Sequence, residues 1–223
     1  MKGSENKKKA RLIAMIVLHL IVVVVTAYAV QSFFSVGGDG NMDVAGAVAF
    51  RYFTVDSNIF AGLSSLILMV CAARQLMGLE NPGWIRVLSL AATTSVALTF
   101  MTVMLFLGPF VYGYALMFVG VSFFMHLTTP LMEIVSFVWL ESVGAKRIKR
   151  RYMVLGVIPM LAYGVVYMTM VVFLKKWPDF YAFNVGGRFW LSIILMTTLT
   201  AGIAFGLGLS ANLVAKKTRE SEL

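Results

Sequence analysis

The chain has 223 residues, of which 60% are hydrophobic and only 13% are charged. A soluble domain of this length needs far fewer apolar residues for one core, so the composition excludes an ordinary soluble protein and indicates an integral membrane protein. The net charge of +9 does not indicate binding to nucleic acid. The basic residues are dispersed over the edges of several predicted loops, where the retention of cations on the cytoplasmic side already explains them.

Six apolar segments are long enough to cross a bilayer, since about 20 residues of α-helix span roughly 30 Å of hydrocarbon. They lie near residues 11–34, 56–77, 85–107, 119–141, 152–174 and 188–214. We therefore predict an all-α fold in which residues 1–223 form a single domain of six transmembrane helices.

The distribution of cations predicts the orientation of these helices. If the amino terminus is cytoplasmic, 15 of the 19 Lys and Arg residues lie on the cytoplasmic side. Lys and Arg near helix ends are retained on that side of the membrane. Both termini are therefore predicted to be cytoplasmic.

Two apolar stretches carry more glycine than a plain spanning helix needs. The stretch "GPFVYGYALMFVGV", residues 108–121, is interrupted by glycine and proline and predicts a re-entrant or interfacial segment. In the last span, Gly202, Gly206 and Ser210 recur every four residues, a spacing that predicts close packing of this face against another helix.

The stretch "RYFTVDSN", residues 51–58, places several polar side chains where an outer loop becomes the second span. Polar groups at membrane depth are costly, so they suggest a function by default. Thr54 and Asn58 are four residues apart and share a helix face, so the Asn58 amide could donate a hydrogen bond to an oxyanion near Thr54. Asp56 points roughly 200° away from Thr54 on a helix and is predicted to accept backbone N–H groups at the helix start.

The fourth span contains the second polar group, "MHLTTPLME", residues 125–133. Pro130 has no N–H for the carbonyl of residue 126 and its ring crowds that carbonyl, so we expect the helix to kink at His126. Glu133 follows His126 by seven residues and returns to nearly the same face. His19, in the first span, is interpreted as a histidine that packs or hydrogen-bonds between helices.

The topology can bring Thr54 and His126 together, because the second and fourth spans run in the same direction and both residues lie near the outer leaflet. A hydroxyl beside an imidazole is the minimal nucleophile and base pair, since the imidazole takes the hydroxyl proton as the oxygen attacks.

"RYFTVD" followed by "MHLTTP" resembles the androgen-induced and androgen-dependent membrane hydrolases and their uncharacterised bacterial relatives. Members of this family cleave fatty acid esters of hydroxy fatty acids. A third stretch, "WPDFYAFNVGGRFW", residues 177–190, is similar to the aromatic loop before that family's last span. The resemblance implies that Thr54 is the nucleophile and His126 the general base. It also implies a multi-pass protein of the bacterial cytoplasmic membrane.

The resemblance thus implies a threonine hydrolase that acts on lipid esters, and the predicted topology puts its site toward the outer leaflet. Its partners are a fatty-acyl ester and the bilayer. Asn58 or Asn184 are candidate oxyanion donors, and Asp56 and Glu133 are candidate supporting groups. Two scattered histidines and one cysteine, Cys71, call for no metal or organic cofactor.

Two alternatives remain open at this point. In a proton-coupled transporter or channel, His126 and Glu133 would form a relay and Pro130 a hinge. In a non-catalytic membrane protein, these polar groups would only join helices.

Overall fold

The computed structural model describes residues 2–35, 46–143 and 145–220 of the chain, and these contain helices and no strand. The first half comprises α1 (Lys2–Ser32), the 3₁₀-helix η1 (Gly46–Arg51), α2 (Phe53–Leu76), α3 (Ile85–Thr102), the π-helix η2 (Val103–Tyr112) and α4 (Tyr114–Met117). The second half begins with α5 (Val121–Phe123), the π-helix η3 (Phe124–Thr128), α6 (Thr129–Val135), the π-helix η4 (Ser136–Leu140), α7 (Arg150–Met153) and the 3₁₀-helix η5 (Val154–Val157). It ends with α8 (Ile158–Met168), the π-helix η6 (Thr169–Phe173), the 3₁₀-helix η7 (Val185–Gly187) and α9 (Phe189–Glu220).

These elements join into six helices that are long and apolar enough to span a membrane, so the prediction of an all-α multi-pass fold is confirmed. They are Glu5–Ser32, Phe53–Leu76, Ile85–Tyr112, Val121–Leu140, Arg150–Phe173 and Phe189–Glu220. The third span runs further than the sequence predicted, because η2 carries the helix through Pro109 to Tyr112.

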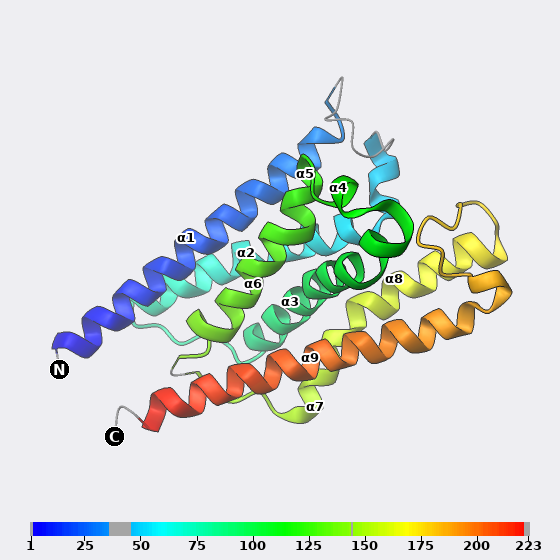
Figure 1. Ribbon diagram of the computed structural model, residues 1–223. Coiled ribbons are helices and arrows are strands. Elements are labelled where there is room, and N and C mark those ends of the chain that lie inside the picture. The colour runs from blue at the N-terminus through cyan, green and yellow to red at the C-terminus, as the bar shows by residue number, and fades with distance from the viewer. Residues whose placement is uncertain (1, 36–45, 144, 221–223) are drawn as a thin grey trace.

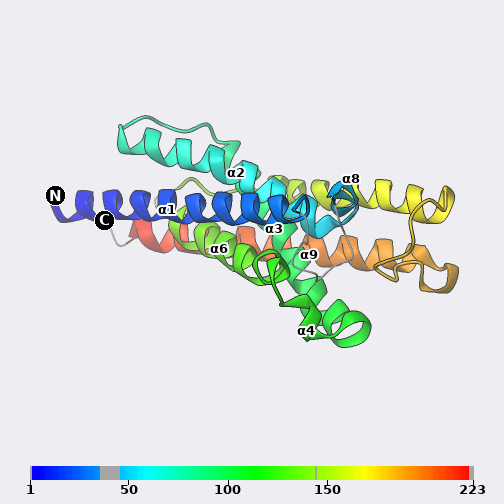
Figure 2. The same cartoon turned by 90° about the horizontal axis from the view of Figure 1, so that it is seen from above.

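The six spans form one bundle with both chain termini at the same end (Figure 1). The opposite end, which we call the distal end, contains η1, α4 and the loop from residue 174 to residue 188. In Figure 2, α1 lies between α2 and α6, and it contacts both helices.

The helix α3 is the centre of the bundle, because it contacts α2, α6, α9 and η5. Every residue from 89 to 99 is buried. The sequence of this stretch, "SLAATTSVALT", is dominated by small residues, which let neighbouring backbones approach closely in a membrane.

The expected distortion of the fourth span is present. The π-helix η3 contains His126 and ends immediately before α6, which has Pro130 in its first turn. Because Pro130 cannot donate to the carbonyl of residue 126, the backbone widens there instead of continuing as regular α-helix.

The predicted re-entrant stretch is partly helix and partly a turn folded back on that helix. Gly113, with φ 81°, ends η2 and reverses the chain into α4. The Tyr114 hydroxyl then donates to the carbonyl of Met104, 2.8 Å away. Gly108 accommodates this return, since a Cβ there would lie only 2.4 Å from the Tyr114 ring.

The prediction of which face of the last span packs against its neighbours is wrong. Gly202, Gly206 and Ser210 are exposed, and a Cβ on either glycine would meet no atom within 4 Å. The buried face is offset from them and consists of Thr200, Ala204, Gly208, Ala211 and Ala215. Small residues occur on both faces of this helix, so their spacing alone did not identify which face packs.

Adding a methyl group at Gly156, in η5, is expected to lower the stability of the bundle. Its Cβ would lie 2.9 Å from the Cβ of Ala204 and 3.1 Å from Oγ1 of Thr94. We expect Gly156→Ala to cost about 1–3 kcal/mol, the usual range for overpacking. Thermal unfolding in detergent measures the effect. Gly206→Ala is the matched control, and equal melting temperatures for the two variants would contradict the packing described here.

Candidate functional site

Thr54 lies in the first turn of α2, at the distal end. The residue before this helix, Tyr52, is extended and provides no side-chain cap. The hydroxyl of Tyr181 caps the helix instead by accepting the N–H of Phe53 at 2.9 Å. The hydroxyls of Thr54 and Tyr163 lie beside the same Tyr181 oxygen. Three hydroxyl groups therefore meet at the positive end of the α2 dipole.

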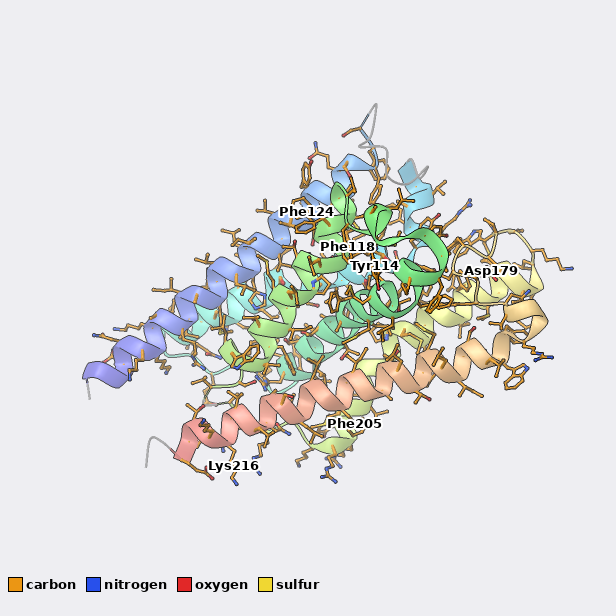
Figure 3. All side chains as sticks on the ribbon, in the orientation of Figure 1. Tyr114, Phe118, Phe124, Asp179, Phe205 and Lys216 are labelled. Atoms are coloured by element: carbon orange, nitrogen blue, oxygen red, sulfur yellow. The ribbon has the colours of Figure 1, made fainter. Side chains whose placement is uncertain are left out.

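The loop before α9 holds Tyr181 in place. One carboxylate oxygen of Asp179 accepts the Tyr167 hydroxyl at 2.7 Å and the N–H of Phe183 at 2.9 Å. Its other oxygen accepts the N–H of Asn184 at 2.8 Å. The Tyr167 hydroxyl in turn accepts the N–H of Tyr181 at 3.2 Å. Figure 3 shows Asp179 in this loop, between α8 and α9.

Tyr181 is a hydrogen-bond donor at any physiological pH. Burial raises the pKa of its hydroxyl above the ordinary value, although the hydrogen bonds from Phe53 and Thr54 oppose that rise. The group therefore keeps its proton. Its oxygen accepts the N–H of Phe53, and the oxygens of Thr54 and Tyr163 are the neighbours to which its proton can be donated.

Thr54 lines a cavity of about 290 Å³, which we call the Thr54 cavity. Most of its wall is apolar and comes from α3, η2, α8, η6 and α9. Its hydroxyl-bearing residues are Thr54, Thr99, Thr102, Tyr163, Tyr167, Thr169, Tyr181, Ser192 and Thr197.

The Thr54 cavity reaches the surface between the fifth and sixth spans. Among its lining residues, Val165 is 68% exposed, Phe173 69% and Ile193 43%. These side chains belong to spans that are long and apolar enough to cross a bilayer. The mouth of the cavity therefore opens sideways, on the apolar surface of the bundle.

His126 is buried and oriented by the folded-back turn. Its Nδ1 lies 2.7 Å from the carbonyl oxygen of Met117, at the end of α4. A carbonyl can only accept, so Nδ1 carries the proton and Nε2 of the neutral ring has a free lone pair. His126 does not line the Thr54 cavity, and within the described residues no hydrogen bond joins it to Thr54.

Asn58 links the two segments that carry Thr54 and His126. Its side-chain nitrogen donates to the carbonyl of Thr54 at 2.8 Å and to the carbonyl of Met125 at 3.1 Å. Both amide protons are therefore used. The prediction that this amide donates to an oxyanion is wrong, because Asn58 instead holds the start of α2 against η3.

Two other predicted supporting residues also lie away from Thr54. Asp56 lines a different cavity and is not the helix cap, since Tyr181 caps α2. Asn184 lies in the loop ordered by Asp179, and it does not line the Thr54 cavity. Neither residue is placed to stabilise an oxyanion at Thr54.

Glu133 belongs to a separate buried chain of hydrogen bonds, nearer to the end of the bundle that holds the two chain termini. Ser65 donates to Glu133 at 2.7 Å and lies 3.0 Å from Nδ1 of His19. On the other side of the ring, Ser136 lies 2.9 Å from Nε2 of His19 and donates to Glu141 at 3.1 Å. The expected relay between His126 and Glu133 is therefore not formed, whereas the interpretation of His19 as a hydrogen-bonding residue between helices is confirmed.

This arrangement couples the charge on His19 to the charges on the two glutamates. A serine hydroxyl has one proton, so a serine that donates to a carboxylate can only accept from the histidine. With both glutamates ionised, Ser65 and Ser136 donate to Glu133 and Glu141, and both ring nitrogens of His19 donate to the serines. The ring is then an imidazolium, 3.8 Å from each of the two carboxylates.

The tyrosines around Thr54 were not predicted to belong to the site. Tyr163 and Tyr167 are four residues apart in the fifth span, and that spacing on an apolar helix was an available signal. Tyr181 and Asp179 lie in the aromatic loop, but only the fold shows that this loop reaches the start of α2.

No protein-family model, no curated protein and no solved structure matches the chain.

Replacing Asn58 by alanine is expected to loosen the contact between α2 and η3. The change leaves the carbonyl of Met125 without its donor, and membrane hydrogen bonds contribute about 0.6 kcal/mol on average and up to about 1.7 kcal/mol. We expect a lower melting temperature and faster amide exchange around residues 124–128. Asn81→Ala, which removes an amide outside the spans, is the control. Unchanged exchange in the Asn58 variant would show that this bond does not hold the segments together.

Replacing His19 by leucine is expected to cost about 3–5 kcal/mol, because it leaves buried carboxylates without their cation. Adding Glu133→Gln removes one of these charges and should recover part of the loss. The free energy of unfolding of His19→Leu, Glu133→Gln and the double variant, measured in the same detergent, tests the charge assignment. If the double variant is less stable than the sum of the two single effects predicts, His19 is not the cation of this cluster.

Proposed function

We propose that the protein is a membrane-embedded hydrolase that cleaves long-chain lipid esters, with Thr54 as nucleophile and His126 as general base. The observation that supports this proposal is a threonine at a helix amino terminus, beside a tyrosine hydroxyl, in the wall of an apolar cavity that opens sideways between two spans. An ester with long apolar chains can enter such a cavity directly from the bilayer.

In the proposed reaction, Nε2 of His126 takes the proton of the Thr54 hydroxyl as its oxygen attacks the ester carbonyl. The tetrahedral intermediate collapses, the carbon–oxygen bond to the leaving alcohol breaks, and His126 returns the proton to that alcohol. Water then attacks the acyl-threonine with the help of His126, which restores the Thr54 hydroxyl and releases the fatty acid.

Tyr181 takes the role of oxyanion donor in this proposal. Its proton is retained because of burial, and its oxygen lies beside Thr54. The amino-terminal end of the α2 dipole adds a positive field at the same point.

His126 must reach Thr54 when substrate is bound. The Asn58 side chain already binds the backbone carbonyl of Thr54 and that of Met125, the residue before His126. Catalytic hydrogen bonds are often long or misaligned in a free enzyme and tighten in the substrate complex. The orientation that the cations predict puts this site at the outer leaflet.

Labelling with a long-chain fluorophosphonate tests the nucleophile. We expect intact-protein mass spectrometry to show one adduct, mapped to Thr54 by digestion and lost in Thr54→Ala. His126→Gln should slow labelling about 10²–10⁴-fold, the usual contribution of a general base. Tyr181→Phe should slow labelling by up to about 10²–10³-fold, as expected for an oxyanion donor.

Thr102→Val is the matched control, because Thr102 lines the same cavity and its hydroxyl has no partner among the described residues. Its labelling rate should equal that of the unchanged protein. Full labelling or full turnover of fatty-acyl esters by a well-folded Thr54→Ala variant would refute the proposal.

A further inference from the structure

A second cavity, of about 340 Å³, lies on the other side of Phe53 and Tyr163 from the Thr54 cavity, and both residues line both cavities. Five aromatic rings and one carboxylate, that of Asp56, line it. We call it the Asp56 cavity. Its rings belong to Phe50, Phe53, Phe60, Tyr163 and Trp177.

Asp56 is the only charged residue in this wall. Within the described residues its carboxylate has neither an ion-pair partner nor a hydrogen-bond donor, and the side chain is partly buried at the start of a spanning helix. The other polar group of the helix face, the Ser57 hydroxyl, is already bonded to the Thr54 carbonyl and to Thr99. An unpaired carboxylate at this depth costs free energy that a bound cation would offset.

The aromatic wall selects the kind of cation. Ring faces carry negative potential and attract an ammonium group without hydrogen bonding to it, which is how aromatic cages bind quaternary ammonium ions. A small metal ion would need several oxygen ligands, and this wall offers one carboxylate among rings. The cavity therefore suits an organic ammonium group.

Arg51 supplies the complementary charge close by. Its guanidinium lies 5.7 Å from the centre of the Trp177 ring, and within the described part of the chain it has no carboxylate partner. A guanidinium in this state pairs well with phosphate. Both groups lie at the distal end, near the ends of the spans, where the head groups of a bilayer lie.

We propose that the Asp56 cavity binds the head group of a zwitterionic phospholipid, with the ammonium against Asp56 and the aromatic rings and the phosphate against Arg51. This binding does not require that Thr54 is a nucleophile. Phe53 and Tyr163, whose ring centres are 5.1 Å apart, stand between the two cavities.

Native mass spectrometry of the full chain tests the proposal. The probes are ether-linked phosphatidylcholine and phosphatidylglycerol with identical chains, which contain no ester and so remain intact whatever the activity of Thr54. We expect the choline lipid to bind about tenfold more tightly than the glycerol lipid, and Asp56→Asn to abolish this preference. Glu80→Gln removes an acidic side chain outside the spans and should leave the preference unchanged.

Two further variants and one competitor complete the test. Phe60→Leu should weaken the preference by removing one ring, and it serves as the second variant if Asp56→Asn does not fold. Competition by tetramethylammonium would show that the ammonium group alone suffices. If tetramethylammonium does not compete, loss of lipid binding in Arg51→Gln would show that the contact with the phosphate is required. Equal binding of the two lipids by the unchanged protein, or an unchanged preference in folded Asp56→Asn, would overturn the proposal.

Discussion

A bilayer offers no water to the polar groups of a spanning helix, so polar groups that pair inside the protein constrain how its helices pack. The chain of hydrogen bonds from Glu133 through Ser65, His19 and Ser136 to Glu141 joins the first, second and fourth spans and the residue that follows the fourth span. Because each side chain of this cluster is bonded to the next one, the rotations of the three helices are coupled. The distal end, where the cavities lie, is built on that fixed arrangement.

The sequence was sufficient for the number and approximate limits of the spans, because length and hydropathy alone determine which segments can cross a membrane. It was also sufficient for the distortion before Pro130, which has a local steric cause. It did not identify α3 as the central helix or the packing face of α9. Both depend on which helices are neighbours, and hydrophobicity does not distinguish a surface in contact with lipid from one in contact with protein.

The polar residues of the site were recognised individually, but their partners were not. Glu133 and His126 share a helix face in an ideal α-helix, yet Glu133 bonds to Ser65 and His126 to Met117, because the π-turn changes the direction of the side chains that follow. Asn58 was recognised as important for its spacing from Thr54. Its amide protons, however, bind two backbone carbonyls, which no one-dimensional pattern reveals.

The cap on α2 makes a distant loop part of the helix start. Tyr181 provides the acceptor for the N–H of Phe53, and Asp179 and Tyr167 fix Tyr181 from within the loop and from α8. If the loop moves away, that N–H loses its acceptor and the first turn of α2 loses its cap. The loop and the residues around Thr54 therefore form one cooperative unit, although Phe53 and Tyr181 are 128 residues apart in sequence. Local unfolding of the loop also opens the first turn of α2.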